Sequence, residues 1–219
     1  KAKMLVNQAK ECGADAVKFQ IRNIQDLYGE FYLHHRENLD LGSQYQLANM
    51  EKTNLDFDEH VKLKEHCRAI DILYISTAFD QTSMDTLKEL DVDAVKISSS
   101  DLTNIDLLNR ASTLNKPTII SLGMSDGSEI LKVKPLISRL FPDFALLHSN
   151  STYPAPFFDI NLAQIRRLRE IHPIIGYSGH ERGINISMGA VSLGANLIGR
   201  GEGALTSPRL AQAHLLLGN

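Results

Sequence analysis

The chain contains no tryptophan and only two cysteines among its 219 residues. Cys12 and Cys67 are too few and too far apart for a disulfide framework or a cysteine-based zinc site. We expect both to be small, buried, apolar residues. The sequence also lacks any apolar run close to the ~20 residues that a membrane-spanning helix requires.

Neither sign of charge is in excess, because 23 basic and 26 acidic residues leave a net charge of −3. This balance predicts no basic surface for nucleic acid or for an anionic membrane. No signal-peptide pattern is present, so we expect a cytoplasmic protein. The chain begins at Lys1, and we expect its natural start to lie further upstream. Its length and its 43% of hydrophobic residues allow one large domain.

Amphipathic stretches and short apolar runs alternate along most of the chain, which indicates a parallel α/β sheet covered by helices. The expected helices are 1–12, Phe57–Ile70, Gln81–Leu90, Asn104–Leu114, Gly127–Leu140, Asn161–Ile171 and Gly183–Leu193. The expected strands are Asp15–Gln20, Ile72–Thr77, Ala94–Ser98, Thr118–Ser121, Phe144–His148, Ile174–Tyr177 and Asn196–Ile198. The polar segment 21–55 is too long for an ordinary connection, so we predict a functional loop or lid there.

Seven strands, each preceded by a helix, favour a TIM (β/α)8 barrel whose first strand is missing before residue 1. The alternative is a doubly wound open sheet, but its glycine-rich dinucleotide fingerprint is absent. We predict a TIM-barrel synthase domain over 1–198 and a C-terminal segment of unclear origin over 199–219.

Two lysines interrupt apolar strands, Lys18 in "GADAVKFQ" and Lys96 in "VDAVKISSSD". A buried ammonium is costly unless an anion meets it. Edge exposure or a structural ion pair is the plainer interpretation, but the strands of a parallel barrel have no solvated edge. Together with the hydroxyl groups at neighbouring strand ends, the two lysines predict a site for phosphate and carboxylate.

The other strand ends carry polar side chains as well, and a barrel places its active site at these ends. His180 follows a strand in "GYSGHE" and could be structural, an acid/base or a metal ligand. Asp101 could be a base or a partner of another site residue, or it could simply cap the helix that follows. The remaining candidates from this pattern are Gln20, Thr77, Ser99, Ser121, Ser151 and Ser178.

Six segments, taken in order, resemble the sialic acid synthase family of phosphoenolpyruvate-dependent condensing enzymes. They are "AKECGADAVKFQ", "ISTAFD", "KISSSD", "KPTIISLGM", "ALLHSNSTYPAP" and "IGYSGHERG". The resemblance implies a TIM barrel, a transferase that joins phosphoenolpyruvate to an N-acyl hexosamine, and a homodimer. The hexosamine would be N-acetylmannosamine, its 6-phosphate or a related sugar, and phosphate would be released.

The resemblance also assigns roles to single residues. Lys18, Lys96, Asp101 and His180 would be catalytic, with Asp101 matching the acidic residue of the family. Gln20 and Tyr153 would lie near the sugar, and His180 would bind a divalent metal, Mn²⁺ or Mg²⁺. The residues that match the phosphoenolpyruvate site are Lys18, Thr77, Lys96, Ser99, Ser121, Ser151 and Ser178.

The sequence departs from the family in three places. A first-strand motif like E-I-G-x-N-H is absent before Lys1, and so is the small C-terminal antifreeze-like domain. The motif E-[RK]-H, which carries a second metal ligand, is replaced by Gly199, Arg200 and Gly201. Either the metal site has been lost, or this sequence is part of a longer one. In the first case the alternative function is a catalytically degenerate barrel that binds a sugar or a phosphorylated ligand. A third hypothesis is an aldolase-type barrel with a Schiff-base lysine.

Overall fold

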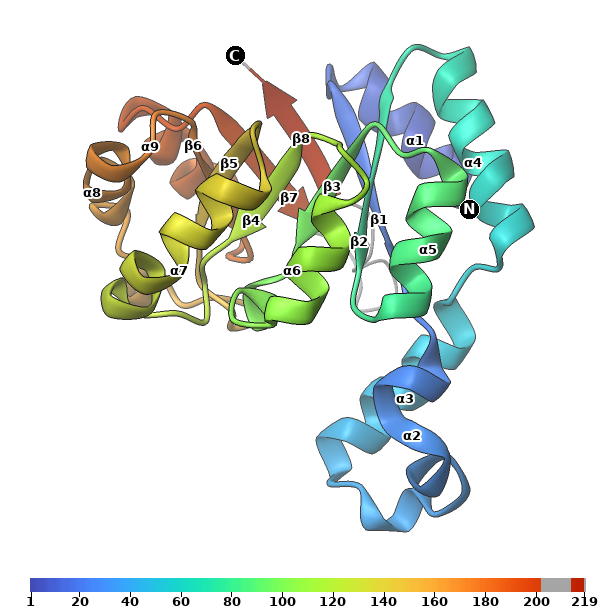
Figure 1. Cartoon of the computed structure of the whole chain (residues 1–219). Coiled ribbons are helices and arrows are strands. Elements are labelled where there is room, and N and C mark those ends of the chain that lie inside the picture. Colours follow the sequence, from blue (N-terminus) through green and yellow to red (C-terminus); the bar gives the residue numbers. More distant parts are fainter. Residues whose placement is uncertain (202–213, 219) are drawn as a thin grey trace.

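The computed structural model describes residues 1–201 and 214–218 of the chain. Seven parallel strands follow one another in chain order and form a curved sheet (Figure 1). These strands are β1 (Ala16–Ile21), β2 (Leu73–Ala78), β3 (Ala94–Ile97), β4 (Thr118–Ser121), β5 (Phe144–Ser149), β6 (Ile175–Gly179) and β7 (Leu197–Gly201). A further strand, β8 (His214–Gly218), lies between β7 and β1 and pairs antiparallel with both.

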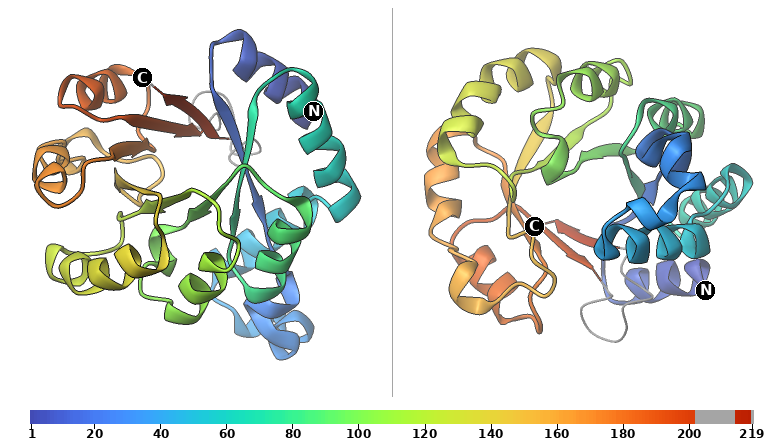
Figure 2. Two further views of the ribbon diagram at one scale, coloured as in Figure 1. Left: turned by 45° about the horizontal axis from the view of Figure 1, so that its top comes forward. Right: turned by 90° about the horizontal axis from the view of Figure 1, so that it is seen from below.

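Helices cover the outer face of these strands, as the end-on views show (Figure 2). Apolar residues on that face, such as Tyr74 and Val95, are fully buried against them. The covering helices are α1 (Ala2–Glu11), α4 (Phe57–Ala69), α5 (Gln81–Leu90), α6 (Ile105–Ser112), α7 (Gly127–Leu140), α8 (Gln164–Ile171) and α9 (Asn185–Ser192). Two 3-10 helices, η2 (Ser99–Asp101) and η3 (Phe157–Asp159), follow β3 and β5.

The molecule is therefore an α/β protein with a TIM-barrel-like sheet. The sequential strand order confirms the expected helix–strand alternation and excludes the doubly wound alternative, in which the strand order reverses. The regular (β/α)8 barrel is not what the described residues form, because antiparallel β8 holds the position of an eighth parallel strand. In that position β8 pairs with the edges of β1 and β7, which would otherwise expose unpaired backbone groups.

The segment 21–55, expected to be a loop or lid, is mostly helical. The prediction of an irregular loop there was therefore wrong. The segment contains the three helices α2 (Ile24–His34), η1 (Arg36–Asn38) and α3 (Leu41–Thr53). We call these three helices together the arm, and the arm projects from the rest of the molecule (Figure 1). Its helices carry no clear amphipathic signal because they bury little. No residue of α2 is buried, and Leu47 is the one buried residue of α3.

Asp101 does not cap the next helix. The Asn104 side chain takes that role, because it accepts the Leu107 backbone N–H at 3.2 Å.

Cys67 is buried as expected, but Cys12 is exposed because it lies at the C-terminal end of α1. The predicted segment 199–219 lies mostly outside the described residues, and its start at residue 199 falls within β7. In the described part of the chain, no helix is long and apolar enough to span a membrane.

Candidate active site

A period of two residues along the strands places the candidate side chains. Successive side chains of a strand point to opposite faces, so residues i and i+2 share a face. On the inner face a small apolar cluster, made by Ala16, Ile75, Ala94, Ile119 and Leu147, forms one layer. Two residues further along, toward the carboxyl end of each of these strands, stand Lys18, Thr77, Lys96, Ser121 and Ser149. Each strand therefore contributes first an apolar residue and then a polar one.

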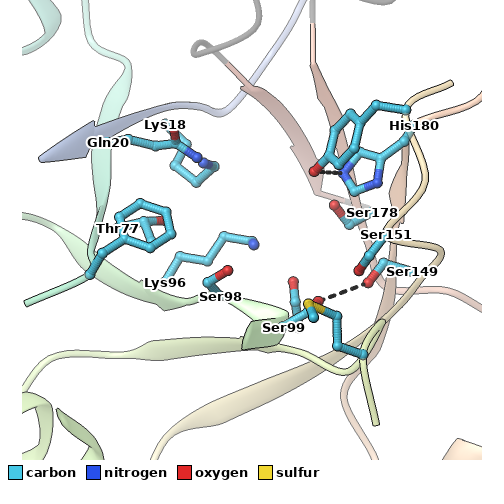
Figure 3. Close-up of a pocket in the computed structure, with 14 residues that line it drawn as sticks. Lys18, Gln20, Thr77, Lys96, Ser98, Ser99, Ser149, Ser151, Ser178 and His180 are labelled. Atoms are coloured by element: carbon cyan, nitrogen blue, oxygen red, sulfur yellow. Dashed lines mark hydrogen bonds between the residues drawn. The ribbon is translucent and has the colours of Figure 1, made fainter. Parts of the chain in front are cut away.

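These polar residues surround one pocket at the carboxyl ends of the strands. Figure 3 shows the two lysines on one side and His180, Ser178 and Ser151 on the other. All the predicted site residues except Asp101 line this pocket. The lining residues are Lys18, Gln20, Thr77, Phe79, Lys96, Ser98, Ser99, Ser121, Met124, Ser149, Ser151, Tyr153, Ser178 and His180.

Four lining residues are absent from the candidate site residues, although Ser149 belongs to the polar strand ends that the sequence shows. Phe79, Ser98 and Ser149 each lie two residues beyond another inner-face residue, so the period of two could have identified them. Met124 lies in the turn after β4, outside any strand or helix, so no periodic pattern in the sequence predicts its place in the pocket.

The two lysines lie in the pocket with no anion to neutralise them. Lys18 is only 2% exposed, and neither ammonium has a hydrogen bond or ion pair with another described residue. Burial, followed by repulsion from Lys96 and Arg22, holds the pKa of Lys18 well below its usual range. Burial lowers the pKa of Lys96 to about 8. Two ammonium groups in one pocket strongly favour the binding of an anion, which would neutralise their charge.

Hydroxyl groups on the pocket wall also lack partners. The Oγ1 atom of Thr77 and the Oγ atom of Ser121 are buried without a hydrogen bond in the described structure. A buried hydroxyl without a partner is costly, so these two groups are placed to bind a ligand. The anion oxygens of a phosphate or carboxylate would accept from both.

The backbone approaches the pocket closely at Gly123. Its N–H donates to Ser99 Oγ at 3.0 Å, and Ser99 Oγ lies 3.4 Å from Ser149 Oγ. A Cβ atom at Gly123 would stand 2.4 Å from Ser149 Oγ and 2.8 Å from Ser151 Oγ. Only glycine therefore lets these three hydroxyls gather around one point.

His180 is held in a defined neutral form. Its Nδ1 lies 2.5 Å from the Asn150 carbonyl oxygen, which can only accept, so Nδ1 carries the proton. Burial is the main cause that lowers the pKa of His180 to about 4. Its Nε2 lone pair accepts from the Tyr153 hydroxyl at 3.0 Å, and the two rings stack with centroids 4.0 Å apart. Tyr153 itself is 70% exposed, so it covers His180 from the solvent side.

Asp101 lies in η2, next to Ser99, but does not reach the pocket lining. Ser100 Oγ donates to its carboxylate at 3.0 Å, and burial raises its pKa. The structure therefore does not bring Asp101 together with the other predicted residues, and its catalytic role stays a prediction.

Among the described residues that line the pocket, His180 is the one His, Cys, Asp or Glu side chain. Its neutral Nε2 has the lone pair that a metal ligand needs, but that lone pair accepts from the Tyr153 hydroxyl, which a metal would have to displace. No group of three His, Cys, Asp or Glu side chains within residues 1–201 and 214–218 is placed to hold a metal ion. Because Mn²⁺ and Mg²⁺ prefer mainly oxygen ligands, His180 alone does not make a metal centre.

Comparison with known proteins gives a consistent family signal. The model of the NeuB family matches residues 5–201. An uncharacterized protein of Methanocaldococcus jannaschii is 40% identical over 198 residues, which cover 90% of this chain and 55% of that protein. The N,N'-diacetyllegionaminic acid synthase of Campylobacter jejuni is 35% identical over 207 residues, covering 90% of this chain and 61% of that enzyme.

A solved structure agrees with both. The sialic acid synthetase of Leptospira borgpetersenii, in complex with citrate, superposes with a TM-score of 0.81 and 31% identity. The match covers 94% of this chain and 67% of that one. The chain spans less than two thirds of the length of either curated relative.

Proposed function

Since the chain belongs to the NeuB family of sialic acid synthases, we propose that the protein condenses phosphoenolpyruvate with an N-acyl hexosamine and releases phosphate. The observation that carries this proposal is that two lysines and two hydroxyls without partners among the described residues converge in one pocket. Phosphoenolpyruvate carries a carboxylate and a phosphate, and this set of donors is complementary to both. The sugar is N-acetylmannosamine, its 6-phosphate or a related hexosamine.

In this proposal the lysines and hydroxyls hold phosphoenolpyruvate, while Gln20 and Tyr153 face the sugar. The C3 carbon of phosphoenolpyruvate attacks the aldehyde carbon of the sugar, water adds at C2, and the C2–O bond to phosphate breaks. The products are a nine-carbon 2-keto acid and phosphate. Lys18 and Lys96 stabilise the negative charge of the phosphoenolpyruvate end throughout. The catalytic role of Asp101 stays part of the proposal, although its side chain is not among those that line the pocket.

The test is a phosphate-release assay on the whole protein with both substrates and Mn²⁺ or Mg²⁺. Release that depends on both substrates supports the synthase. A specific observation, Gly201 at the place of the second metal-ligand histidine, favours the degenerate barrel as the alternative. Binding of phosphoenolpyruvate or sugar without phosphate release would support that alternative.

Binding of phosphoenolpyruvate should be coupled to proton uptake. Burial lowers the pKa of Lys96 to about 8, so part of the Lys96 population is neutral near pH 8, and the pKa of Lys18 is lowered as well. A bound trianion raises both pKa values. Because protons are taken up on binding, the affinity should fall as pH rises through about 8. Calorimetric titrations at pH 8, in two buffers with different ionisation enthalpies, measure this uptake. Identical enthalpies in the two buffers would show that the lysines are already charged in the empty pocket.

We propose a divalent cation as the cofactor, bound by His180 together with oxygen ligands that a substrate supplies. When bound, such a cation polarises a carbonyl oxygen as a Lewis acid. Mn²⁺ should bind weakly to the protein alone and more tightly in the presence of phosphoenolpyruvate. Its paramagnetic effect on water relaxation measures both affinities. If the His180→Ala variant binds Mn²⁺ as well as the wild type, His180 is not a ligand.

We further propose that the whole protein is a cytoplasmic homodimer with a regular (β/α)8 barrel, in which a parallel strand takes the position of β8. The arm is the proposed contact surface, because it exposes large apolar side chains to solvent. They include Phe31, Leu41 and Tyr45, which are 59%, 83% and 64% exposed. Replacing all three with serine should shift the protein from dimer to monomer in light scattering. An unchanged dimer mass would place the interface elsewhere.

A further inference from the structure

Gln20 faces the pocket, but its side-chain amide is also bound from behind by Arg22. The guanidinium Nη2 of Arg22 donates to Gln20 Oε1. Arg22 itself does not line the pocket. Gln20 lies in β1, and Arg22 is the first residue after the strand.

This contact decides which end of the Gln20 amide the pocket can use. An arginine side chain has only N–H donors, so the atom of Gln20 that faces it must be the oxygen. The amide nitrogen, with its two N–H donors, is then left for the pocket. Without Arg22 the amide could rotate and present either an acceptor or a donor.

Arg22 is itself fixed from several sides. Its guanidinium carbon lies 4.7 Å from the ring centroid of Phe79, in a cation–π contact with a pocket residue. Its backbone carbonyl accepts the Asn54 side-chain amide at 3.0 Å, which joins the two ends of the arm. The guanidinium of Arg22 therefore packs between Gln20 and Phe79, and its Nη1 is buried without a hydrogen-bond partner in the described structure.

We propose that Arg22 is a positioning residue that makes Gln20 a pure hydrogen-bond donor toward the sugar. The pocket then selects a sugar oxygen, of a hydroxyl or an acyl carbonyl, at this point and rejects an analogue that presents only a donor there. This inference rests on the proposed synthase function for its substrate. Its structural part, the orientation of the Gln20 amide, does not depend on that function.

The kinetic test uses the whole protein and the phosphate-release assay. Arg22→Met should raise KM for the sugar roughly tenfold, as for loss of one positioned hydrogen bond, while KM for phosphoenolpyruvate stays within about twofold. Gln20→Glu keeps an acceptor for Arg22 but removes the donors, so it should impair sugar binding as much as Gln20→Ala does. Arg22→Lys keeps a donor and should recover part of the loss. Arg139→Met is the matched control, because Arg139 is an exposed arginine of α7, away from the arm and the pocket.

A double-mutant cycle separates positioning from an independent role. If Arg22 acts through Gln20, Arg22→Met should add no further loss in the Gln20→Ala background. Additive losses, or an unchanged KM for the sugar in Arg22→Met, would overturn the proposal.

A second measurement does not need activity. The side-chain amide signals of Gln20 in a ¹H–¹⁵N spectrum are identified by their loss in Gln20→Ala. Arg22→Met should shift these signals and speed the exchange of their protons with water. A wild-type protein that releases no phosphate would contradict the proposed function alone, and these signals would then decide the role of Arg22. Unchanged Gln20 signals in Arg22→Met would refute it.

Discussion

Replacing Lys96 with alanine should lower kcat/KM for phosphoenolpyruvate by about 10²-fold or more, which corresponds to ~3 kcal/mol. The reason is the position of its ammonium, which lies inside the pocket with no anionic partner in the described structure. Loss of this charge removes an interaction with the phosphate or carboxylate of the substrate. Steady-state kinetics with varied phosphoenolpyruvate and saturating sugar measure the effect.

A surface lysine provides the control for this experiment. Lys62 is exposed on α4, and Lys62→Ala should leave the kinetics unchanged. Removing Lys96 also removes one of the charges that lower the pKa of Lys18, so Lys18 should become more fully protonated. This partial compensation limits the loss, and Lys18→Ala should be at least as damaging. Unchanged phosphoenolpyruvate kinetics in Lys96→Ala would refute the assignment of the anion site.

The sequence predicted those residues of the candidate site that lie within strands. Lys18, Thr77, Lys96, Ser121 and Ser178 all lie on the inner face of a parallel strand, and the apolar pattern of the strand reveals that face. The pattern could not place Asp101. Asp101 follows β3 in η2, where the period of two no longer holds, and it is not among the residues that line the pocket.

The fold was predictable to the same extent, because amphipathic helices and buried strands leave a periodic signal only where they pack against the sheet. The bounds of α5, β4 and α7 agree with the expected ones. The helices of the arm were not predicted from the sequence, because α2 buries no residue and therefore has no apolar face with a helical period. The antiparallel pairing of β8 was also not predictable, since a short apolar run does not reveal its direction or its partners.

Arg200 stands where the E-[RK]-H motif would place its basic residue, and it supports the segment that carries His180. Its guanidinium Nη1 pairs with Oε1 of Glu181, which is fully buried directly after His180. Its Nη2 donates to the backbone carbonyls of Glu181 at 2.9 Å and Gly183 at 2.6 Å. The Tyr177 hydroxyl donates to the other carboxylate oxygen at 2.7 Å. This network satisfies a carboxylate that has no access to water.

Arg200→Met should therefore lower the free energy of unfolding by about 3–5 kcal/mol, because it leaves the Glu181 charge buried without its cation. The double variant Arg200→Met/Glu181→Gln should regain much of that loss, since the remaining amide is neutral and can still accept from Tyr177. The exposed pair of Arg36 and Glu51 is the matched control, and Arg36→Met should leave the free energy of unfolding nearly unchanged because solvent screens an exposed ion pair. Urea denaturation of the four proteins measures these differences. A loss in Arg200→Met no larger than that in Arg36→Met, or no recovery in the double variant, would show that the buried pair does not hold the His180 segment in place.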